Sequence, residues 1–412
     1  MIDCERVRKD FPELGSGLVY LDSAASTLKP KPVVDSMKEF ALRRYSNVHR
    51  GTYKLAVEAT RIYEEAHRVI AEFIGAKRWE EIVFTYNTTH AINLVAWTLV
   101  YNGVLKRGDE ILVTEAEHHS NLLPWAAAAR AVGARLRILP VDPQGIPVWE
   151  DIDEYITDRT RVVAFHLASN VTGAKAPVEE VSRAARSRGA IIVVDGAQGV
   201  PHFPIDVNSM NIDFLAFSGH KMLGPTGIGV LWGRLELLED LEPPWQGGGQ
   251  IRDVRVVGDT VAVDWDEPPW KFEPGTPPIV EAVGLTEAVR YLEKLGMSNV
   301  ESHESELVRE LYEWLGEIRG VKPVGPPPSQ HPRTGVVSFT LEGLTPDAVS
   351  VYLASRGIAV RAGLHCAHPL HYALGLYEGT IRASLYIYNC SRDAEALVSS
   401  VESLVKLIGK TG

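Results

Sequence analysis

The chain has 412 residues, enough for a large domain and a smaller one, and with 45% apolar and 23% charged residues it has the composition of a soluble globular protein. Its formal net charge of -11 argues against a protein that binds nucleic-acid phosphates through a basic surface. The opening residues lack the apolar segment of a signal peptide, and the longest apolar-rich run, 91–105, is too short to span a bilayer. We therefore expect a cytoplasmic protein that binds neither nucleic acid nor membranes.

The first two thirds of the chain predict an α/β arrangement. Residues 1–18 are expected to form an arm with a short helix, 18–27 an extended segment, and 32–45 and 56–74 two helices. Apolar runs then predict strands at 82–85, 110–114, 136–141, 162–167, 191–194, 214–217 and 228–232. Helical patterns lie between the earlier strands, an alternation typical of βαβ units and a largely parallel sheet.

The last third of the chain predicts a hairpin and a second, smaller domain. Alternating residues at 254–265, between two loops rich in Pro and Gly, indicate the hairpin, and 280–295 a long helix. The smaller sheet is expected from 335–341, 357–363 and 380–389, with 322–332 as a Pro-rich surface connection and 394–407 as a closing helix. The predicted parts are an arm at 1–18 that packs with the small domain, a large domain at 19–285 and a small domain at 286–412.

The three cysteines fit neither a disulfide framework nor the spacing of a zinc site, so no metal is expected. Cys390 follows an apolar run, as a buried structural cysteine does, and Cys4 lies in the charged arm without an evident role. Cys366 differs from both because it lies in the Gly-, His- and Pro-containing loop RAGLHCAHPLH. Cationic neighbours in that loop, Arg361 and His365 among them, would favour a reactive thiolate.

The segment 190–221 carries the main candidate site. Asp195 stands at the carboxyl end of one buried strand and Lys221 shortly after the next, at the edge where parallel sheets bind ligands. A lysine and a carboxylate at one edge suit pyridoxal phosphate (PLP), because the lysine binds the cofactor and the acid keeps its ring nitrogen protonated. Thr88 and Thr89, at the start of a helix, offer hydroxyl and N–H groups to a phosphate.

DGAQ at 195–198 followed by SGHK at 218–221 resembles the class V aminotransferase group of PLP enzymes, and within it the SufS-like, group II cysteine desulfurases. The resemblance spans nearly the whole chain. It implies a PLP-dependent transferase of fold type I, the aspartate-aminotransferase-like fold. That fold has a large, mostly parallel-sheet domain and a small C-terminal α+β domain. It also implies a homodimer.

The resemblance assigns roles to individual residues. Lys221 would bind PLP and later move the substrate Cα proton, while His118 stacks on the cofactor ring and assists proton transfer. Asn170 would contact the substrate carboxylate or a cofactor oxygen, and Arg382 would bind the carboxylate. The remaining residues assigned to the cofactor or substrate are Gln198, Ser218, His220, His49, Arg361 and, from the other subunit, Thr276.

The implied reaction converts L-cysteine to L-alanine and leaves a persulfide on Cys366, which passes its sulfur to an acceptor or scaffold protein for iron–sulfur cluster assembly. The loop departs from the usual R-T-G-x-H-C-A-x-P form, since Ala362 replaces the threonine and Leu364 stands where a second histidine is common. These departures keep the nucleophile and leave substrate preference and rate open.

Three alternatives remain at this stage. The first is another class V reaction, that of a selenocysteine lyase, an aminotransferase or a kynureninase. The second is a nicotinamide-dependent dehydrogenase, disfavoured because no G-x-G-x-x-G follows the first strand. The third is a non-catalytic sulfur carrier, disfavoured because the residue types that hold PLP are all present.

Overall fold

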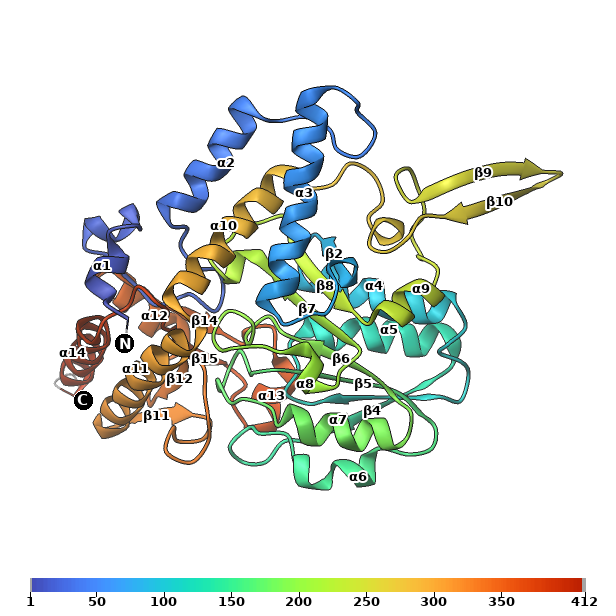
Figure 1. Ribbon diagram of the computed structural model, residues 1–412. Coiled ribbons are helices and arrows are strands. Elements are labelled where there is room, and N and C mark those ends of the chain that lie inside the picture. Colours follow the sequence, from blue (N-terminus) through green and yellow to red (C-terminus); the bar gives the residue numbers. More distant parts are fainter. Residues whose placement is uncertain (1, 410–412) are drawn as a thin grey trace.

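The computed structural model describes residues 2–409 and is built on a seven-stranded sheet (Figure 1). The strand order is β2-β8-β7-β6-β5-β3-β4. Parallel pairs join β7, β6, β5, β3 and β4, whereas β8 is antiparallel to both of its neighbours. The strands are β2 (Ile82–Thr85), β3 (Glu110–Thr114), β4 (Arg135–Leu139), β5 (Thr160–His166), β6 (Ile191–Asp195), β7 (Phe214–Ser218) and β8 (Gly229–Gly233). Each predicted strand of the large domain is confirmed to within two residues.

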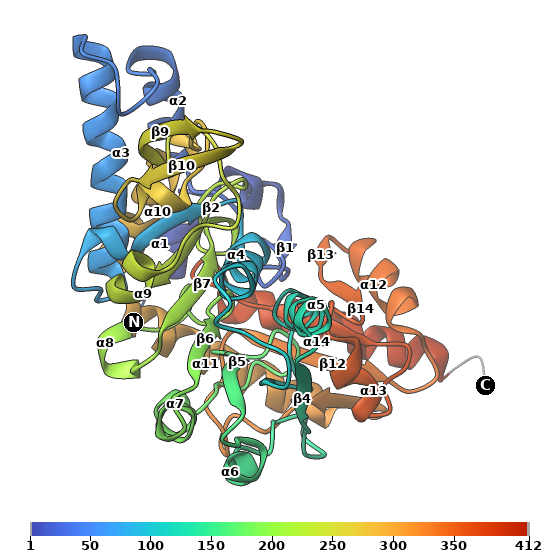
Figure 2. The same cartoon turned by 90° about the vertical axis from the view of Figure 1, so that its right-hand side faces the viewer.

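Helices cover both faces of this sheet because its central strands are apolar throughout. In β6, Ile192 and Val194 face one core cluster while Val193 faces another, as the alternation of side chains along a strand requires. In Figure 2, α4 and α5 lie on one side of the strands and α7 on the other. The helices of this region are α2 (Lys31–Arg43), α3 (Lys54–Phe73), α4 (Thr88–Tyr101), α5 (Leu123–Val132), α6 (Ile152–Tyr155), α7 (Val178–Ser187), α8 (Val207–Met210), α9 (Leu235–Asp240) and α10 (Ile279–Leu295).

The C-terminal region forms a four-stranded antiparallel sheet of order β11-β12-β15-β14. Its elements are α11 (Met297–Glu317), β11 (Val321–Val324), β12 (Val336–Leu341), α12 (Pro346–Ala354), β14 (Arg361–Gly363), α13 (His368–Ala373), β15 (Thr380–Ser384) and α14 (Ser391–Ile408). The expectation of a surface connection at 322–332 was wrong at its start, because residues 321–324 pair with β12 as a strand. The predicted boundary after residue 285 falls inside α10 and stays a prediction.

The stretch 357–363, expected as one strand, divides between two sheets. Its first part, β13 (Ile358–Ala359), pairs in parallel with β1 (Val19–Tyr20), and its second part is β14 of the small sheet. The extended segment predicted at 18–27 is therefore tied to the C-terminal region.

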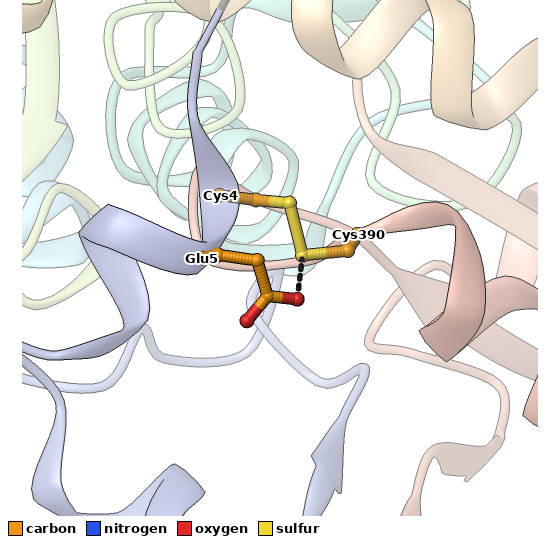
Figure 3. A group of neighbouring side chains, drawn as sticks. All are labelled: Cys4, Glu5 and Cys390. Atoms are coloured by element: carbon orange, nitrogen blue, oxygen red, sulfur yellow. Dashed lines mark hydrogen bonds between the residues drawn. A yellow bond between two sulfur atoms is a disulfide. The ribbon is translucent and has the colours of Figure 1, made fainter.

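The N-terminal helix α1 (Cys4–Arg8) lies against the start of α14. Arg8 forms an ion pair of 2.8 Å with the buried Asp393. Cys4 and Cys390 form a disulfide, with Glu5 beside it (Figure 3). The expectation that Cys4 is incidental and that no disulfide forms was wrong. The two cysteines are 386 residues apart, so only the packing of the two ends of the chain brings them together.

The predicted hairpin is also confirmed, with strands β9 (Ile251–Val257) and β10 (Thr260–Trp265). It extends away from the body of the molecule (Figure 1), and its Val256 side chain is 81% exposed. Within residues 2–409, no helix combines the length and the apolar character needed to cross a bilayer.

Candidate active site

The structure brings most of the predicted site residues around one cavity of about 480 Å³. The cavity lies at the carboxyl ends of the central strands, and the loop before α13 closes it from the C-terminal side. The predicted residues that line it are Thr88, Thr89, His118, Asn170, Asp195, Gln198, Ser218, His220, Lys221, Arg361, Cys366 and Arg382. His49 and Thr276 lie elsewhere, together in a separate groove of about 830 Å³ at the base of the hairpin.

Asp195 is buried and Lys221 is half-buried, and removal from water shifts their pKa values in opposite directions. Asp195 ends β6, its carboxylate accepts a hydrogen bond of 2.9 Å from the Ala197 N–H, and burial raises its pKa to about 6. Burial lowers the pKa of Lys221 to about 8, an effect that the Asp195 charge opposes. A useful fraction of the Lys221 amine is therefore uncharged and nucleophilic near neutral pH.

The start of α4 forms an anion site with hydroxyl groups from two neighbouring segments. Asn87 caps the helix, and the Ser218 hydroxyl lies 2.6 Å from the Thr88 hydroxyl and accepts from the Thr88 N–H at 2.9 Å. The hydroxyls of Thr89 and Ser120 are 2.6 Å apart. The positive end of the helix dipole and the clustered hydroxyls together suit a phosphate.

His118 is held in one neutral form. The Ser120 N–H donates a hydrogen bond of 3.1 Å to His118 Nδ1, so the ring proton of neutral His118 is on Nε2. Burial and the nearby Lys221 charge lower the pKa of His118 to about 3. His118 therefore presents an uncharged ring at the cavity.

The loop that carries Cys366 is strained and is held from the large domain. His365 and Cys366 have φ values of 47° and 55°, in the left-handed region that non-glycine residues rarely adopt. Asn170 Nδ2 donates to the His365 carbonyl at 2.8 Å, and the His119 N–H donates to the Cys366 carbonyl at 2.8 Å. These two bonds hold the turn, and Cys366, an exposed free cysteine, lines the cavity.

The cations around Cys366 differ from those that the sequence suggested. Burial lowers the pKa of His365 to about 2, and its Nε2 is 2.9 Å from the Thr380 hydroxyl, so His365 is a neutral support and not a cationic neighbour. Arg361, Arg382 and Lys221 are the cations instead, because a Cys366 thiolate raises the pKa of each of them. Residues of both domains thus place positive charge around the Cys366 sulfur.

Arg382 is buried at the cavity wall, and only some of the N–H groups of its guanidinium have hydrogen-bond partners. Its Nη1 donates to the Asn170 carbonyl at 3.0 Å, while its Nε has no hydrogen-bond partner within residues 2–409. Asp22 lies 3.7 Å from Arg382 and accepts two hydrogen bonds, of 3.1 and 2.8 Å, from Arg361. Sequence reasoning missed Asp22, which lies in the segment 18–27 that was expected only to be extended.

Two further residues were missed, His166 at the end of β5 and Glu117 after β3. His166 lines the cavity, and its Nδ1 is 2.8 Å from the buried Glu117 carboxylate. His166 could have been recognised from its position near the carboxyl end of a predicted strand, the one that precedes in the chain the strand that carries Asp195.

A family model described as aminotransferase class-V matches residues 19–397. This chain belongs to the class V aminotransferase family. A probable cysteine desulfurase from Aeropyrum pernix is 53% identical over 407 residues, which cover 98% of each chain.

Among solved structures, the apo form of a cysteine desulfurase from Thermococcus onnurineus superposes with a TM-score of 0.93 at 43% identity and covers 98% of both chains. The cysteine desulfurase CsdA from Escherichia coli superposes with a TM-score of 0.90 at 38% identity and covers 99% of both chains. The predicted fold class, fold type I of the PLP-dependent transferases, is confirmed.

Proposed function

We propose that this chain is a PLP-dependent cysteine desulfurase that converts L-cysteine to L-alanine and receives the sulfur on Cys366. One observation carries the proposal. A half-buried lysine, a buried carboxylate and a free cysteine line the same cavity, although the cysteine comes from the C-terminal region and the other two from the large sheet. The relatives named cysteine desulfurase, which match over almost the full chain, support the same activity.

The residues present fit PLP. Lys221 would bind the cofactor, Asp195 would face its ring nitrogen, and the start of α4 with Thr88 and Ser218 would hold its phosphate. Gln198 Oε1 is buried and has no hydrogen-bond partner within residues 2–409, as expected of a side chain that contacts a ligand. When bound, PLP supplies an electron sink for the charge that develops on the substrate Cα.

The chain's own residues orient the substrate and move its proton. The Arg382 guanidinium, whose Nε has no hydrogen-bond partner within residues 2–409, would bind the carboxylate of the amino-acid substrate. A guanidinium can bind a carboxylate through two parallel hydrogen bonds. Lys221 takes the Cα proton, because its lowered pKa makes the amine a base near neutral pH. Neutral His118 adds no charge to the cavity and would offer its Nε2–H to the bound molecules.

Sulfur transfer then falls to Cys366. Its thiolate attacks the substrate sulfur, so that an S–S bond forms while the Cβ–S bond breaks and leaves its electron pair on carbon. That carbon takes up a proton and becomes the methyl group of alanine, and Cys366 carries a persulfide. Because Cys366 is exposed, the thiol of a sulfur-acceptor protein can reach the persulfide.

The proposal includes a homodimer. His49 and Thr276 share a groove outside the main cavity, next to a hairpin with exposed valines at 254, 256, 257 and 261. A second copy packed on the hairpin would cover these side chains and could receive Thr276 at its own anion site.

The test is alanine released from L-cysteine, with a reductant, by the wild type, Cys366→Ala and Lys221→Ala. We expect Cys366→Ala to lose alanine production and keep the cofactor absorbance, and Lys221→Ala to lose both. Equal alanine from the wild type and Cys366→Ala would remove Cys366 from the mechanism. A PLP-loaded wild type that releases no alanine would refute the desulfurase activity and favour another class V reaction.

A further inference from the structure

Three neighbouring strands place a carboxylate, an imidazole and a second carboxylate in a row at the edge of the sheet. Asp195 ends β6, His166 ends β5, and the two residues are register partners in the parallel pair. Glu117 follows β3, which pairs with β5 on its other side. Asp195 and His166 both line the cavity, while Glu117 is fully buried behind His166.

The Glu117 carboxyl group accepts hydrogen bonds from four donors. Its Oε1 accepts from the Thr114 hydroxyl at 2.6 Å, from the His166 N–H at 3.2 Å and from His166 Nδ1 at 2.8 Å, and its Oε2 accepts from Asn121 Nδ2 at 2.7 Å. Of these donors only the His166 ring can carry a charge. A buried carboxylate needs such a counter-charge, because burial without one is costly.

The same contact settles how His166 presents itself to the cavity. Its Nδ1 faces Glu117, so Nδ1 carries a proton and Nε2 is the atom left for the cavity. Glu117, with a smaller effect from Asp195, outweighs burial and raises the pKa of His166. The imidazolium form would place a positive charge at the cavity floor beside Asp195.

Asp195 needs a neighbouring positive charge to stay ionised. Burial and Glu117 both raise its pKa, while Lys221 and His166 are the cations that oppose them. Lys221 gives up its free ammonium when it binds the cofactor, as the proposed function requires, which leaves His166 as the other of these two cations beside Asp195.

We propose that His166, fixed by Glu117, is a positioning residue that keeps Asp195 ionised, so that Asp195 can hold the ring nitrogen of the cofactor protonated. The inference rests on the proposed function for the identity of the cofactor. The arrangement of Glu117, His166 and Asp195 does not depend on it. His166 touches neither the reacting sulfur nor the substrate Cα in this account and acts through Asp195.

The first test is the affinity for PLP between pH 5 and 9, measured by absorbance titration of cofactor-free protein, for the wild type, His166→Gln and His166→Lys. In His166→Gln we expect the loss of affinity at low pH to begin about one to two pH units higher than in the wild type, because a nearby cation is gone. Affinity at pH 6.5 would then be about tenfold lower than at pH 8.5. His166→Lys, which restores a positive charge, is expected to move the midpoint back toward that of the wild type.

A merely structural role would lower the affinity of His166→Gln by one factor at every pH, and that result would overturn the proposal. His303→Gln is the matched control, because His303 is also buried but binds the Asn389 carbonyl in the C-terminal region. It is expected to keep the wild-type profile, and a shifted midpoint in this control would also count against the proposal.

The second test uses only the wild-type protein, so its outcome does not depend on whether a variant folds. Nitrogen-15 NMR of histidine-labelled, cofactor-free wild type should show the His166 ring titrating above the ordinary histidine pKa of 6.5, and a pKa at or below that value would overturn the inference. If the proposed function itself were wrong, the wild type would bind no PLP or would release no alanine, and this result differs from those that would overturn the role of His166.

Discussion

Breaking the disulfide between Cys4 and Cys390 tests how the two ends of the chain stabilise this protein. The bond closes a loop of 386 residues. In the chain-entropy treatment a loop of that length restricts the unfolded chain by about 6 kcal/mol, and removal of native disulfides costs about 2–5 kcal/mol in practice. We expect Cys4→Ser to lose about 4 kcal/mol of unfolding free energy, which lowers the Tm of a chain of this size by about 5 °C. The ion pair between Arg8 and Asp393 remains and keeps α1 in place.

The assay combines thiol counting with thermal unfolding. The unreduced, denatured wild type should show one reactive thiol per chain, that of Cys366, and three after reduction. Reduction should lower the Tm of the wild type and leave that of Cys4→Ser unchanged. Cys366→Ala is the matched control and should respond to reduction as the wild type does. Three reactive thiols in unreduced protein, or a wild-type Tm that ignores the reductant, would refute the reasoning.

Two other residues give sharp expectations. Asn170→Ala removes the hydrogen bond to the His365 carbonyl that holds the strained turn. Alanine production should therefore fall about tenfold, while the affinity for PLP stays within about twofold of the wild-type value. A loss of PLP affinity with unchanged alanine production would contradict a loop-holding role for Asn170. Lys221→Met tests the burial of the amine in cofactor-free protein, since burial lowers the pKa of Lys221 to about 8 from the ordinary lysine value of 10.5. Below pH 8 the folded chain carries a half-buried ammonium at a cost of roughly 3 kcal/mol, and this cost is relieved as the pH rises toward 10.5. Denaturant unfolding should therefore find Lys221→Met more stable than the wild type at pH 7, with a difference that shrinks by pH 10, and a pH-independent difference would disprove the shift.

The sequence by itself determined the strands of the large domain and much of the site. Runs such as Ile191–Val194 and Phe214–Phe217 are short and apolar at every position, a pattern typical of strands buried on both faces of a parallel sheet. Parallel strands end at one edge, so residues that follow them, Asp195 and Lys221 among them, had to converge there. Local pattern and the rules of sheet construction were sufficient for these features.

Tertiary structure alone decided which distant segments meet and what charge they carry. The contact of Cys4 with Cys390 and the division of 357–363 between two sheets depend on how the C-terminal region packs against the rest of the chain. The neutral state of His365 depends on burial, which no neighbour in the sequence reveals. The pairing of Glu117 with His166 likewise requires the loop after β3 to meet the end of the adjacent strand β5. Sequence periodicity reports the face on which a side chain lies, whereas contact between remote segments and the energy of a buried charge are set by the packed surroundings.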